Sequence, residues 1–179
     1  MSDLRALGIA ASITGPSRSR ALVERTLALL AAEGVRTALL DLNDLPAEAL
    51  LGRRADPALD AAIGQVADAR IVLLGTPTYR ATYSGLLKTF FDLLPREALV
   101  GRVVGAVATG AVPIHALMLD HGLRPLVASL GGLGAAGLLY VTDAEYPSAA
   151  GADVPEPVLV RLRALASELR RLGEALAPR

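Results

Sequence analysis

The 179-residue sequence contains no cysteine. It therefore has no thiolate nucleophile, disulfide or iron–sulfur ligand, and it lacks the usual ligands of structural zinc sites. It also lacks an excess of either charge, because 18 lysines and arginines balance 18 aspartates and glutamates. Without a net positive field, the chain is not expected to bind nucleic acid.

Long apolar runs are also missing. No run reaches the roughly 18 to 20 residues that a membrane-spanning helix needs, and the segment MSDLRALGIAAS lacks the charged and apolar regions of a signal peptide. We therefore expect a soluble, cytoplasmic protein with no membrane partner. Hydrophobic residues still make up 53 % of the chain, which is enough to build a core. The length predicts a single domain over residues 1–179.

Short apolar runs alternate with helical segments along the chain. The expected strands are 4–12, 35–42, 69–76, 101–110 and 135–143, and the expected helices are 19–34, 56–69, 84–95, 113–132 and 155–176. The runs are apolar throughout, which indicates strands buried on both faces of a parallel sheet. The sequence therefore predicts an α/β fold, a five-stranded doubly wound sheet with helices on both faces. Segment 144–154 is expected to be a mobile loop.

The turn after the first strand, SITGPSRSR, is rich in hydroxyl groups. Four of them surround Arg18 at the start of a helix, and they belong to Ser12, Thr14, Ser17 and Ser19. Unpaired N–H groups at a helix N-terminus favour an anion, and hydroxyl and guanidinium groups add donors. A serine in this place can also simply cap the helix, but capping uses only one hydroxyl. The turn therefore predicts a phosphate site.

This turn matches neither of the common nucleotide-phosphate motifs. The sequence GxxxxGK[ST] is absent, and no GxGxxG follows the first strand. A single phosphate that carries a flat ring, as in FMN, fits better. Such a ligand lies at the switch point of a flavodoxin-like sheet with strand order 2-1-3-4-5.

A second polar turn follows the third strand, in GTPTYRATYSGLLKTFFDLLP. Pro77 stiffens this turn by fixing its own φ and restricting the preceding residue. The backbone N–H groups of Thr78, Tyr79 and Arg80 are expected to face the pyrimidine edge of a flavin, which gains negative charge on reduction. Ordinary half-buried packing is the alternative role for the two tyrosines of the segment.

The same segment resembles the signature of NAD(P)H-dependent FMN reductases, in which a Pro-x-Tyr turn precedes Ser-Gly-x-Leu-Lys and an aspartate. It is similar in particular to the reductases of two-component alkanesulfonate monooxygenase systems. The segments SITGPSRSRAL and VATGAVPIHALMLDHGLRPLVASL agree with this family, and the likeness spans about residues 4–142. The resemblance implies a flavodoxin-like fold, FMN as cofactor or substrate, hydride transfer from NAD(P)H, and release of reduced flavin to a partner monooxygenase.

The resemblance also implies roles for individual residues. By position, the FMN phosphate site comprises Ser12, Ser17, Arg18 and Ser19, the ring-edge loop comprises Pro77, Thr78, Tyr79 and Arg80, and Thr109 and Gly110 line the flavin. Lys88 and Asp92 match the signature too, but their spacing is typical of an ion pair on a helix surface. Ala111 departs from the family, in which a second glycine is common at this position.

No catalytic side chain is expected, because hydride transfer needs only positioning and electrostatics from the protein. A metal site is not expected either, since His115 and His121 have no carboxylates at ligand spacing.

Segment 113–130 combines helical periodicity with two residues that disturb helices, Gly122 and Pro125. Pro125 has no N–H for the carbonyl of His121, so we expect a distortion within 118–125. In the resembled reductases a residue inserted in this helix makes a π-bulge at a tetramer interface, and His121 occupies its position. An exposed histidine beside a proline kink is the alternative.

The resemblance thus implies a homodimer or homotetramer that assembles through helix 113–130. Leu117, Met118 and Leu119 are expected to add apolar surface to that interface.

Two other functions are compatible with the sequence. A quinone, azo or chromate reductase would keep the fold and retain its FMN. A flavodoxin-type electron carrier is the non-enzymatic alternative, although such carriers are usually strongly acidic. A phospho-acceptor receiver domain is excluded, because it would need an acidic cluster after the first strand and an aspartate at the end of the third.

Overall fold

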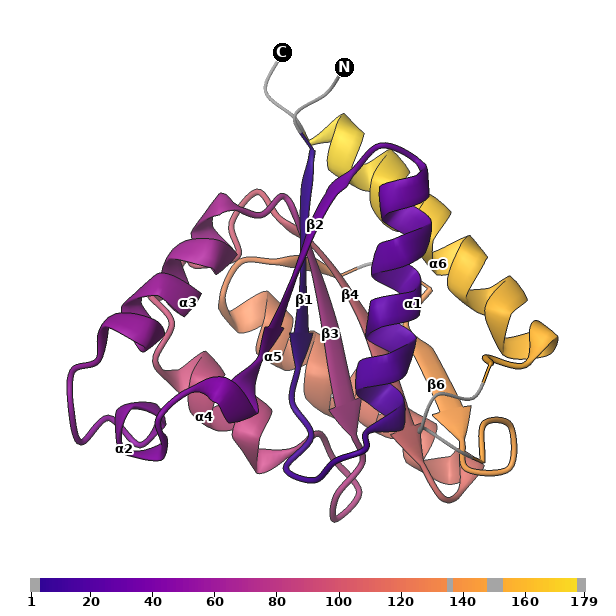
Figure 1. Ribbon diagram of the computed structural model, residues 1–179, viewed down its shortest axis with the longest axis horizontal. Helices are drawn as coiled ribbons and strands as arrows, with labels where there is room; N and C mark the ends of the chain where they lie inside the picture. The colour runs from indigo at the N-terminus through magenta and orange to yellow at the C-terminus, as the bar shows by residue number, and fades with distance from the viewer. Residues whose placement is uncertain (1–3, 135–136, 148–152, 177–179) are drawn as a thin grey trace.

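The computed structural model describes residues 4–134, 137–147 and 153–176. Its parallel sheet has the strand order β2-β1-β3-β4-β5, and a further strand, β6, pairs with β4 (Figure 1). The strands are β1 (Arg5–Ala10), β2 (Arg36–Asp41), β3 (Ile71–Pro77), β4 (Val103–Gly110), β5 (Leu133–Gly134) and β6 (Leu139–Thr142). This order confirms the predicted flavodoxin-like topology.

The last strand differs from the prediction. In place of one strand over 135–143, β5 pairs with the beginning of β4 and β6 pairs with its end. The partners of Val104 and Val107 on β4 are Gly134 and Leu139. More residues separate Gly134 from Leu139 than separate Val104 from Val107, so β5 and β6 cannot pair with β4 as one continuous strand. Residues 135–136 of the expected strand lie outside the described residues, as do residues 148–152 of the expected mobile loop.

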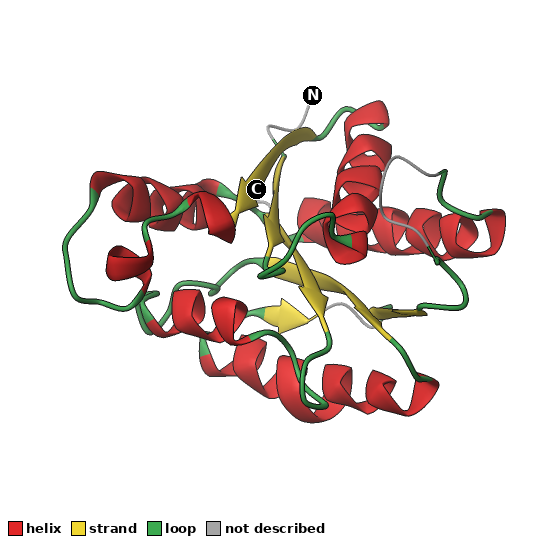
Figure 2. Cartoon of the chain, turned by 60° about the horizontal axis from the view of Figure 1, so that its bottom comes forward, coloured by secondary structure: helices red, strands yellow, loops and turns green. Residues whose placement is uncertain are grey.

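Helices cover both faces of the sheet, as the layers in Figure 2 show. The longer helices are α1 (Arg18–Ala32), α3 (Pro57–Asp68), α4 (Gly85–Asp92), α5 (Arg124–Ser129) and α6 (Glu156–Ala175). Shorter ones are the 3-10 helices η1 (Leu42–Asp44) and η2 (Pro113–Ala116), α2 (Ala47–Leu50) and the π-helix η3 (Leu119–Leu123). None of the described helices has both the length and the apolarity needed to span a membrane.

Each face of the sheet has its own apolar core. Successive residues of β1 point to opposite faces, so Ala6 packs on the side of α1 and α6 while Leu7 packs on the side of α3 and α4. Burial on both faces explains why the strands are apolar throughout. A Cβ added at Gly8 or Gly75 would fall 2.6 or 2.5 Å from the side chain of Val23. These glycines therefore let the first half of α1 lie close to the sheet.

Helix boundaries follow the local sequence signals. Ser17 caps α1, because its Oγ accepts a hydrogen bond from the N–H of Arg20 at 3.2 Å. The chain leaves α1 through Gly34, whose φ of 84° suits glycine. Ser84 caps α4 in the same way as Ser17, with its Oγ 3.1 Å from the N–H of Leu87. Both caps lie at the carboxyl edge of the sheet, where they fix the ends of the loops described below.

The distortion predicted within 118–125 is confirmed. A 3-10 turn is followed by the π-helix η3 and then by α5, and the N–H of Arg124 donates to the carbonyl of Leu119, five residues earlier. Pro125 lies in the first turn of α5 and has no N–H for the carbonyl of His121. Of the apolar residues expected at the surface, Leu117 is exposed, but Met118 and Leu119 are buried in the core.

Candidate functional site

The carboxyl ends of β1, β3 and β4 lie next to one another at one edge of the sheet, the lower edge in Figure 1. The loops after these strands enclose a cavity of about 260 Å³, which we call the edge cavity. Its lining comprises Ser12, Thr14, Pro16, Ser17, Arg18, Pro77, Thr78, Tyr79, Thr109, Gly110, Ala111 and Asp143. Every predicted site residue except Ser19 and Arg80 therefore lines a single cavity.

The hydroxyl groups of the first loop have different roles. Ser12 is buried, and its Oγ donates to the carbonyl of Thr14 at 2.8 Å, which folds the loop back on itself. Ser17 caps α1, which confirms the helix-capping role that was the alternative for a serine in this turn. Ser19 is buried behind Ser17, with the two Oγ atoms 3.0 Å apart. Of the four hydroxyls, that of Thr14 is the exposed one at the mouth of the edge cavity.

Arg18 brings a positive charge into the edge cavity together with an unpredicted negative one. Its guanidinium lies 2.7 Å from a carboxylate oxygen of Asp143. Asp143 follows β6, and its N–H donates to the carbonyl of Gly110 at 3.0 Å, which holds it against the end of β4. The sequence signal for Asp143 was its position directly after an apolar strand, because the ends of parallel strands share one edge. A guanidinium has five N–H donors, so Arg18 keeps donors for an anion.

Arg20 lies on the other side of the first loop. It bonds the carboxylates of Glu24 at 2.9 Å and of Asp41 at 2.5 Å, and the hydrogen bond to Glu24 is the largest cause of its raised pKa. It lines a neighbouring cavity of about 500 Å³, which the edge cavity adjoins along Ser12 to Ser17. Arg18 is thus the arginine that faces the edge cavity.

The turn after β3 corrects one expectation. The N–H of Thr78 donates to the carbonyl of Thr109 at 2.7 Å, and the N–H of Tyr79 donates to the carbonyl of Thr82 at 2.9 Å. The prediction that these two N–H groups point at a ligand is therefore wrong in this structure. The turn closes on itself instead, and Arg80 is exposed at its tip, outside the cavity lining.

This turn also carries backbone strain. Arg80 and Ala81 have φ values of 52° and 65°, a left-handed conformation that glycine or asparagine adopts more readily. Tyr79 lines the edge cavity, and its hydroxyl lies 3.4 Å from that of Thr14 in the first loop. The first loop and the turn after β3 are therefore in contact over the cavity.

Two buried residues with hydroxyl groups, which the sequence analysis did not identify, stabilise the turn after β3. The N–H of Ser84 donates to the Oγ1 of Thr76 at 2.9 Å, and both residues are fully buried. This bond joins the last part of β3 to the start of α4. The preference of serine for helix N-caps could have identified Ser84, whereas Thr76 looks like any other residue of the strand.

The floor of the edge cavity requires a glycine. A Cβ at Gly110 would fall 2.3 Å from the hydroxyl of Tyr140 and 3.1 Å from the Cβ of Thr78. Tyr140 comes from β6 and is 7 % exposed. Its burial raises its pKa, and the nearby Thr78 hydroxyl offsets part of that rise. A neutral phenol therefore fills the space that a side chain at position 110 would occupy.

The remaining polar candidates lie away from the edge cavity. Lys88 Nζ is 2.6 and 2.8 Å from the two carboxylate oxygens of Asp92, and both side chains are exposed. The hydrogen bond to Asp92 is the largest cause of the raised pKa of Lys88. This confirms a surface ion pair. Among the residues that the structure describes, no three histidine, aspartate or glutamate side chains form a group that could hold a metal ion.

The donor set of the edge cavity fits a phosphate ester. Arg18, the hydroxyl of Thr14 and the N-terminus of α1 line it together with the small residues Gly110 and Ala111 and the aromatic Tyr79. A phosphate is favoured beside unpaired helix N–H groups and a guanidinium. A flat ring is favoured beside small and aromatic residues.

Comparisons with known proteins agree with this chemistry. The family model described as NADPH-dependent FMN reductase matches residues 4–144. An FMN reductase (NADPH) of Pseudomonas putida is 34 % identical over 164 residues, which cover 91 % of this chain and 83 % of the relative. The NADH-dependent FMN reductase SfnF of Pseudomonas fluorescens is 33 % identical over 183 residues, which cover 98 % and 95 %.

A solved structure supports the same assignment. The apo form of an NADH:FMN oxidoreductase, EMOB, superposes with a TM-score of 0.84 at 29 % identity, and covers 98 % of this chain and 91 % of its own. The match to the family model spans most of the sequence and includes the loops after β1, β3 and β4. The chain therefore belongs to the NADPH-dependent FMN reductase family.

Proposed function

We propose that this protein transfers a hydride from NADH or NADPH to FMN and releases the reduced flavin to a flavin-dependent monooxygenase. One observation carries the proposal: the loops after β1, β3, β4 and β6, which are far apart in the sequence, converge on one cavity whose donors suit a phosphate ester beside a flat ring. The family membership supports the same reaction.

In this proposal the protein binds and orients FMN and the nicotinamide nucleotide, and the cofactor supplies the redox chemistry. Thr14, Arg18 and the N-terminus of α1 hold the phosphate. Tyr79, Thr109 and Gly110 position the ring. The backbone hydrogen bonds of the turn after β3 hold Tyr79 in contact with the first loop. When bound, FMN would supply the redox chemistry as the acceptor of a hydride from the dihydronicotinamide of NADH or NADPH. No side-chain acid or base is needed for this step.

Asp143 supports exchange of FMN rather than its permanent retention. Its carboxylate lines the edge cavity and already engages Arg18 at 2.7 Å. A phosphate with close to two negative charges must therefore bind near a carboxylate, which costs free energy. Weakened phosphate binding suits a flavin that enters oxidised and leaves reduced. It does not suit a quinone, azo or chromate reductase that keeps its FMN.

The reaction is tested by steady-state oxidation of NADH and of NADPH, with FMN, FAD and riboflavin supplied separately. We expect turnover that depends on added FMN, and a protein that is colourless after purification. A yellow protein that reduces a quinone or an azo dye without added flavin would favour the retained-cofactor alternative.

The phosphate site is tested by Arg18→Gln with Arg53→Gln as a matched control, since Arg53 is exposed in the loop between α2 and α3. Loss of one charged hydrogen bond costs roughly 1.5–3 kcal/mol, so FMN should bind more than about tenfold more weakly to the Arg18 variant. Riboflavin, which has no phosphate, should bind equally to both. Equal weakening of FMN and riboflavin would contradict the phosphate assignment.

We further propose a homodimer or homotetramer that assembles through segment 113–130. Support comes from the family likeness and from Ile114 and Leu117, which are 66 and 51 % exposed in this segment, and from Val112 directly before it, which is 41 % exposed. Light scattering should give a multiple of the 18.5 kDa chain, and Ile114→Glu with Leu117→Glu should reduce it to one chain. An unmodified protein that is monomeric at micromolar concentration would contradict this.

A further inference from the structure

The cavity on the Arg20 side of the first loop has no part in the flavin site described above. Its volume is about 500 Å³, compared with about 260 Å³ for the edge cavity. It lies where β1 and β2 end, because its lining includes Ala10 and Asp41, the last residues of these strands. The two cavities adjoin along the first loop, residues 12–17. We call this larger one the second cavity.

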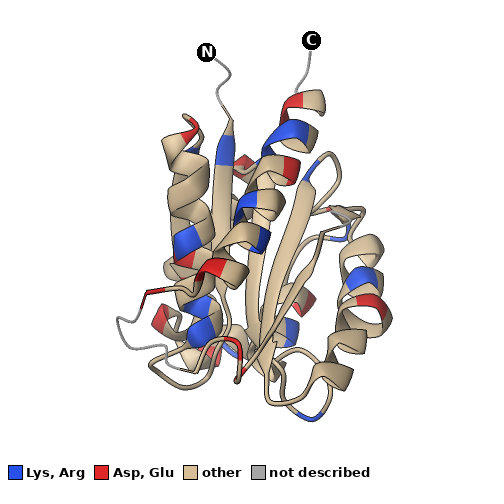
Figure 3. Ribbon diagram, turned by 90° about the vertical axis from the view of Figure 1, so that its right-hand side faces the viewer, with Lys and Arg blue, Asp and Glu red and all other residues tan. Residues whose placement is uncertain are grey.

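The second cavity has an excess of negative charge. Among the described residues that line it, the three carboxylates of Glu24, Asp41 and Asp44 face the one guanidinium of Arg20. Arg20 is already bound by Glu24 at 2.9 Å and by Asp41 at 2.5 Å. Figure 3 shows basic and acidic residues mixed at this lower end of the molecule. A further negative charge is therefore disfavoured in the second cavity.

The second cavity also offers hydrogen-bond acceptors beside an apolar surface. Asp44 is exposed, and its side chain makes no hydrogen bond or ion pair with the described residues. The amide nitrogen of Asn43 donates to Asp41 at 2.9 Å, which leaves the amide oxygen of Asn43 as a second acceptor. Ile13 adds an apolar side chain that is 60 % exposed. An uncharged group with a flat apolar face and several donors, such as a nucleoside, suits this lining.

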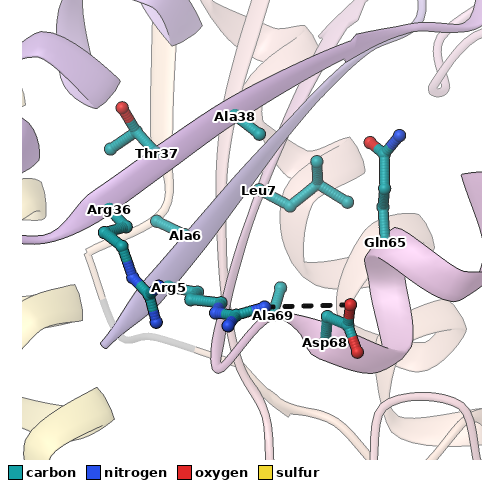
Figure 4. A pocket seen from close by; sticks show the side chains of 9 residues that line it. All are labelled: Arg5, Ala6, Leu7, Arg36, Thr37, Ala38, Gln65, Asp68 and Ala69. Carbon is teal, nitrogen blue, oxygen red and sulfur yellow. Dashed lines mark ion pairs between the residues drawn. The ribbon is translucent and has the colours of Figure 1, made fainter. Parts of the chain in front are cut away.

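The second cavity lies within reach of a molecule that is bound in the edge cavity. The strand order β2-β1-β3-β4 puts three strand spacings between the end of β2 and the end of β4, which is roughly 14 Å at about 4.8 Å per spacing. A dinucleotide can extend over this distance, because a pyrophosphate joins its two halves. The hollow in Figure 4 lies instead at the start of β1 and β2, about 20 Å away along the six residues of β1.

We propose that the second cavity binds the adenosine of a dinucleotide whose other half occupies the edge cavity, and that it selects an adenosine with a free 2′-hydroxyl. This inference rests on the proposed reaction, which brings a nicotinamide nucleotide and a flavin to the edge cavity. NADH carries such an adenosine, and so does FAD when it replaces FMN. Ribose hydroxyls and the adenine amino group donate to the carboxylate and amide oxygens. A 2′-phosphate, as in NADPH, would instead be repelled by the carboxylates.

Calorimetry with 5′-AMP and 2′,5′-ADP tests the site. The protein is saturated with FMN, so that the phosphate position beside Arg18 is filled. We expect saturable binding of 5′-AMP, and severalfold weaker binding of 2′,5′-ADP because of its additional 2′-phosphate. Asp44→Asn removes one carboxylate from the lining, so it should bring the two affinities closer together. The control Asp60→Asn removes the same charge from the exposed face of α3 and should leave their ratio unchanged.

Steady-state kinetics identify which dinucleotide uses the second cavity. Ile13→Ala reduces the apolar surface, so KM should rise severalfold for that substrate with little change in kcat. A rise for NADH, with FMN as the acceptor, assigns the cavity to the hydride donor, and kcat/KM should then be higher for NADH than for NADPH. A rise for FAD but not for FMN assigns it to the flavin. The control Leu51→Ala shortens an exposed leucine outside the lining of both cavities and should change neither KM.

Folding is checked by thermal unfolding of Asp44→Asn and Ile13→Ala, which alter exposed side chains and should melt like the unmodified protein. The proposal is overturned by the absence of saturable heat with 5′-AMP, by equal affinities for 5′-AMP and 2′,5′-ADP in the unmodified protein, or by an unchanged KM for both NADH and FAD in Ile13→Ala. Turnover with FMN would persist in each of these cases. Failure of the proposed reaction is distinct, because FMN-dependent turnover would then be missing altogether.

Discussion

At the scale of single residues, Asp143 has the most direct consequence for ligand affinity. Its carboxylate pairs with Arg18 inside the edge cavity. Asp143→Asn removes a negative charge next to the expected phosphate position, and an interaction of about 1 kcal/mol corresponds to roughly fivefold tighter FMN binding. Riboflavin should bind as before. Flavin fluorescence titration measures both affinities, and weaker binding of FMN would show instead that Asp143 acts by orienting Arg18.

Much of the edge cavity was predictable residue by residue, but its detailed contacts were not. The polar turn that follows the first apolar strand identified Thr14 and Arg18, because the ends of parallel strands share one edge, and the family resemblance identified Thr109. Tyr140 was not identified, since it stands inside an apolar run and reaches Gly110 only through the register of β6 on β4. The N–H directions of the turn after β3 depend on its dihedral angles, which composition does not specify.

At the scale of elements, the turn after β3 stores strain that a substitution can release. Ala81 has a φ of 65°, which costs about 1–2 kcal/mol for a residue with a Cβ. Glycine removes that cost but makes the unfolded chain more flexible, so Ala81→Gly should raise the free energy of unfolding by roughly 0.5–1 kcal/mol. Urea denaturation measures the change.

The matched control is Ala61→Gly, in the exposed face of α3. There glycine replaces alanine in an ordinary helix, so the free energy of unfolding should fall by about 1 kcal/mol. Destabilisation by both substitutions would show that the left-handed turn is not strained in solution.

Elements with strong local signals were predicted, and those that depend on register or length were not. The helices were found from their periodicity and boundaries, and the distortion within 118–125 from the missing N–H of Pro125, whereas its π-helical form was implied by the family resemblance. The division of the last strand into β5 and β6 depends on pairing with β4, which periodicity does not show. The short segments η1 and α2 are too brief to have a periodic pattern.

At the scale of the whole molecule, the edge cavity exists only when the sheet is complete. Its walls come from the loops after β1, β3, β4 and β6, so FMN should bind the folded chain and not the unfolded one. At 100 times its dissociation constant, such a ligand adds about 2.7 kcal/mol to the free energy of unfolding, or roughly 5–10 °C in the melting temperature of a domain of this size.

Thermal unfolding at increasing FMN concentration measures this effect. The shift should be larger in Asp143→Asn and smaller in Arg18→Gln at the same FMN concentration, in line with their affinities. A melting temperature that does not depend on FMN would contradict binding at the assembled cavity.

The topology was predictable at this scale, but the distribution of charge was not. Apolar runs that alternate with helices restrict the sheet to few arrangements, and the polar turn after the first strand favours the flavodoxin-like one. The net charge of zero does not show that Arg5, Arg36 and Arg70 are neighbours, because the strand register is needed to bring them together.

The ion pair of Lys88 and Asp92 has a practical consequence for chemical labelling. Lys88 is the one lysine of the sequence, so an amine-reactive dye has a single side-chain target, on the helix that begins directly after the turn at Ser84. Because Asp92 raises the pKa of Lys88, the neutral amine that reacts is scarce until the pH is high. Asp92→Asn should move the acylation profile to lower pH, which mass spectrometry can follow. The labelled protein would then carry a fluorescent reporter on α4, about one helical turn after the loop that follows β3.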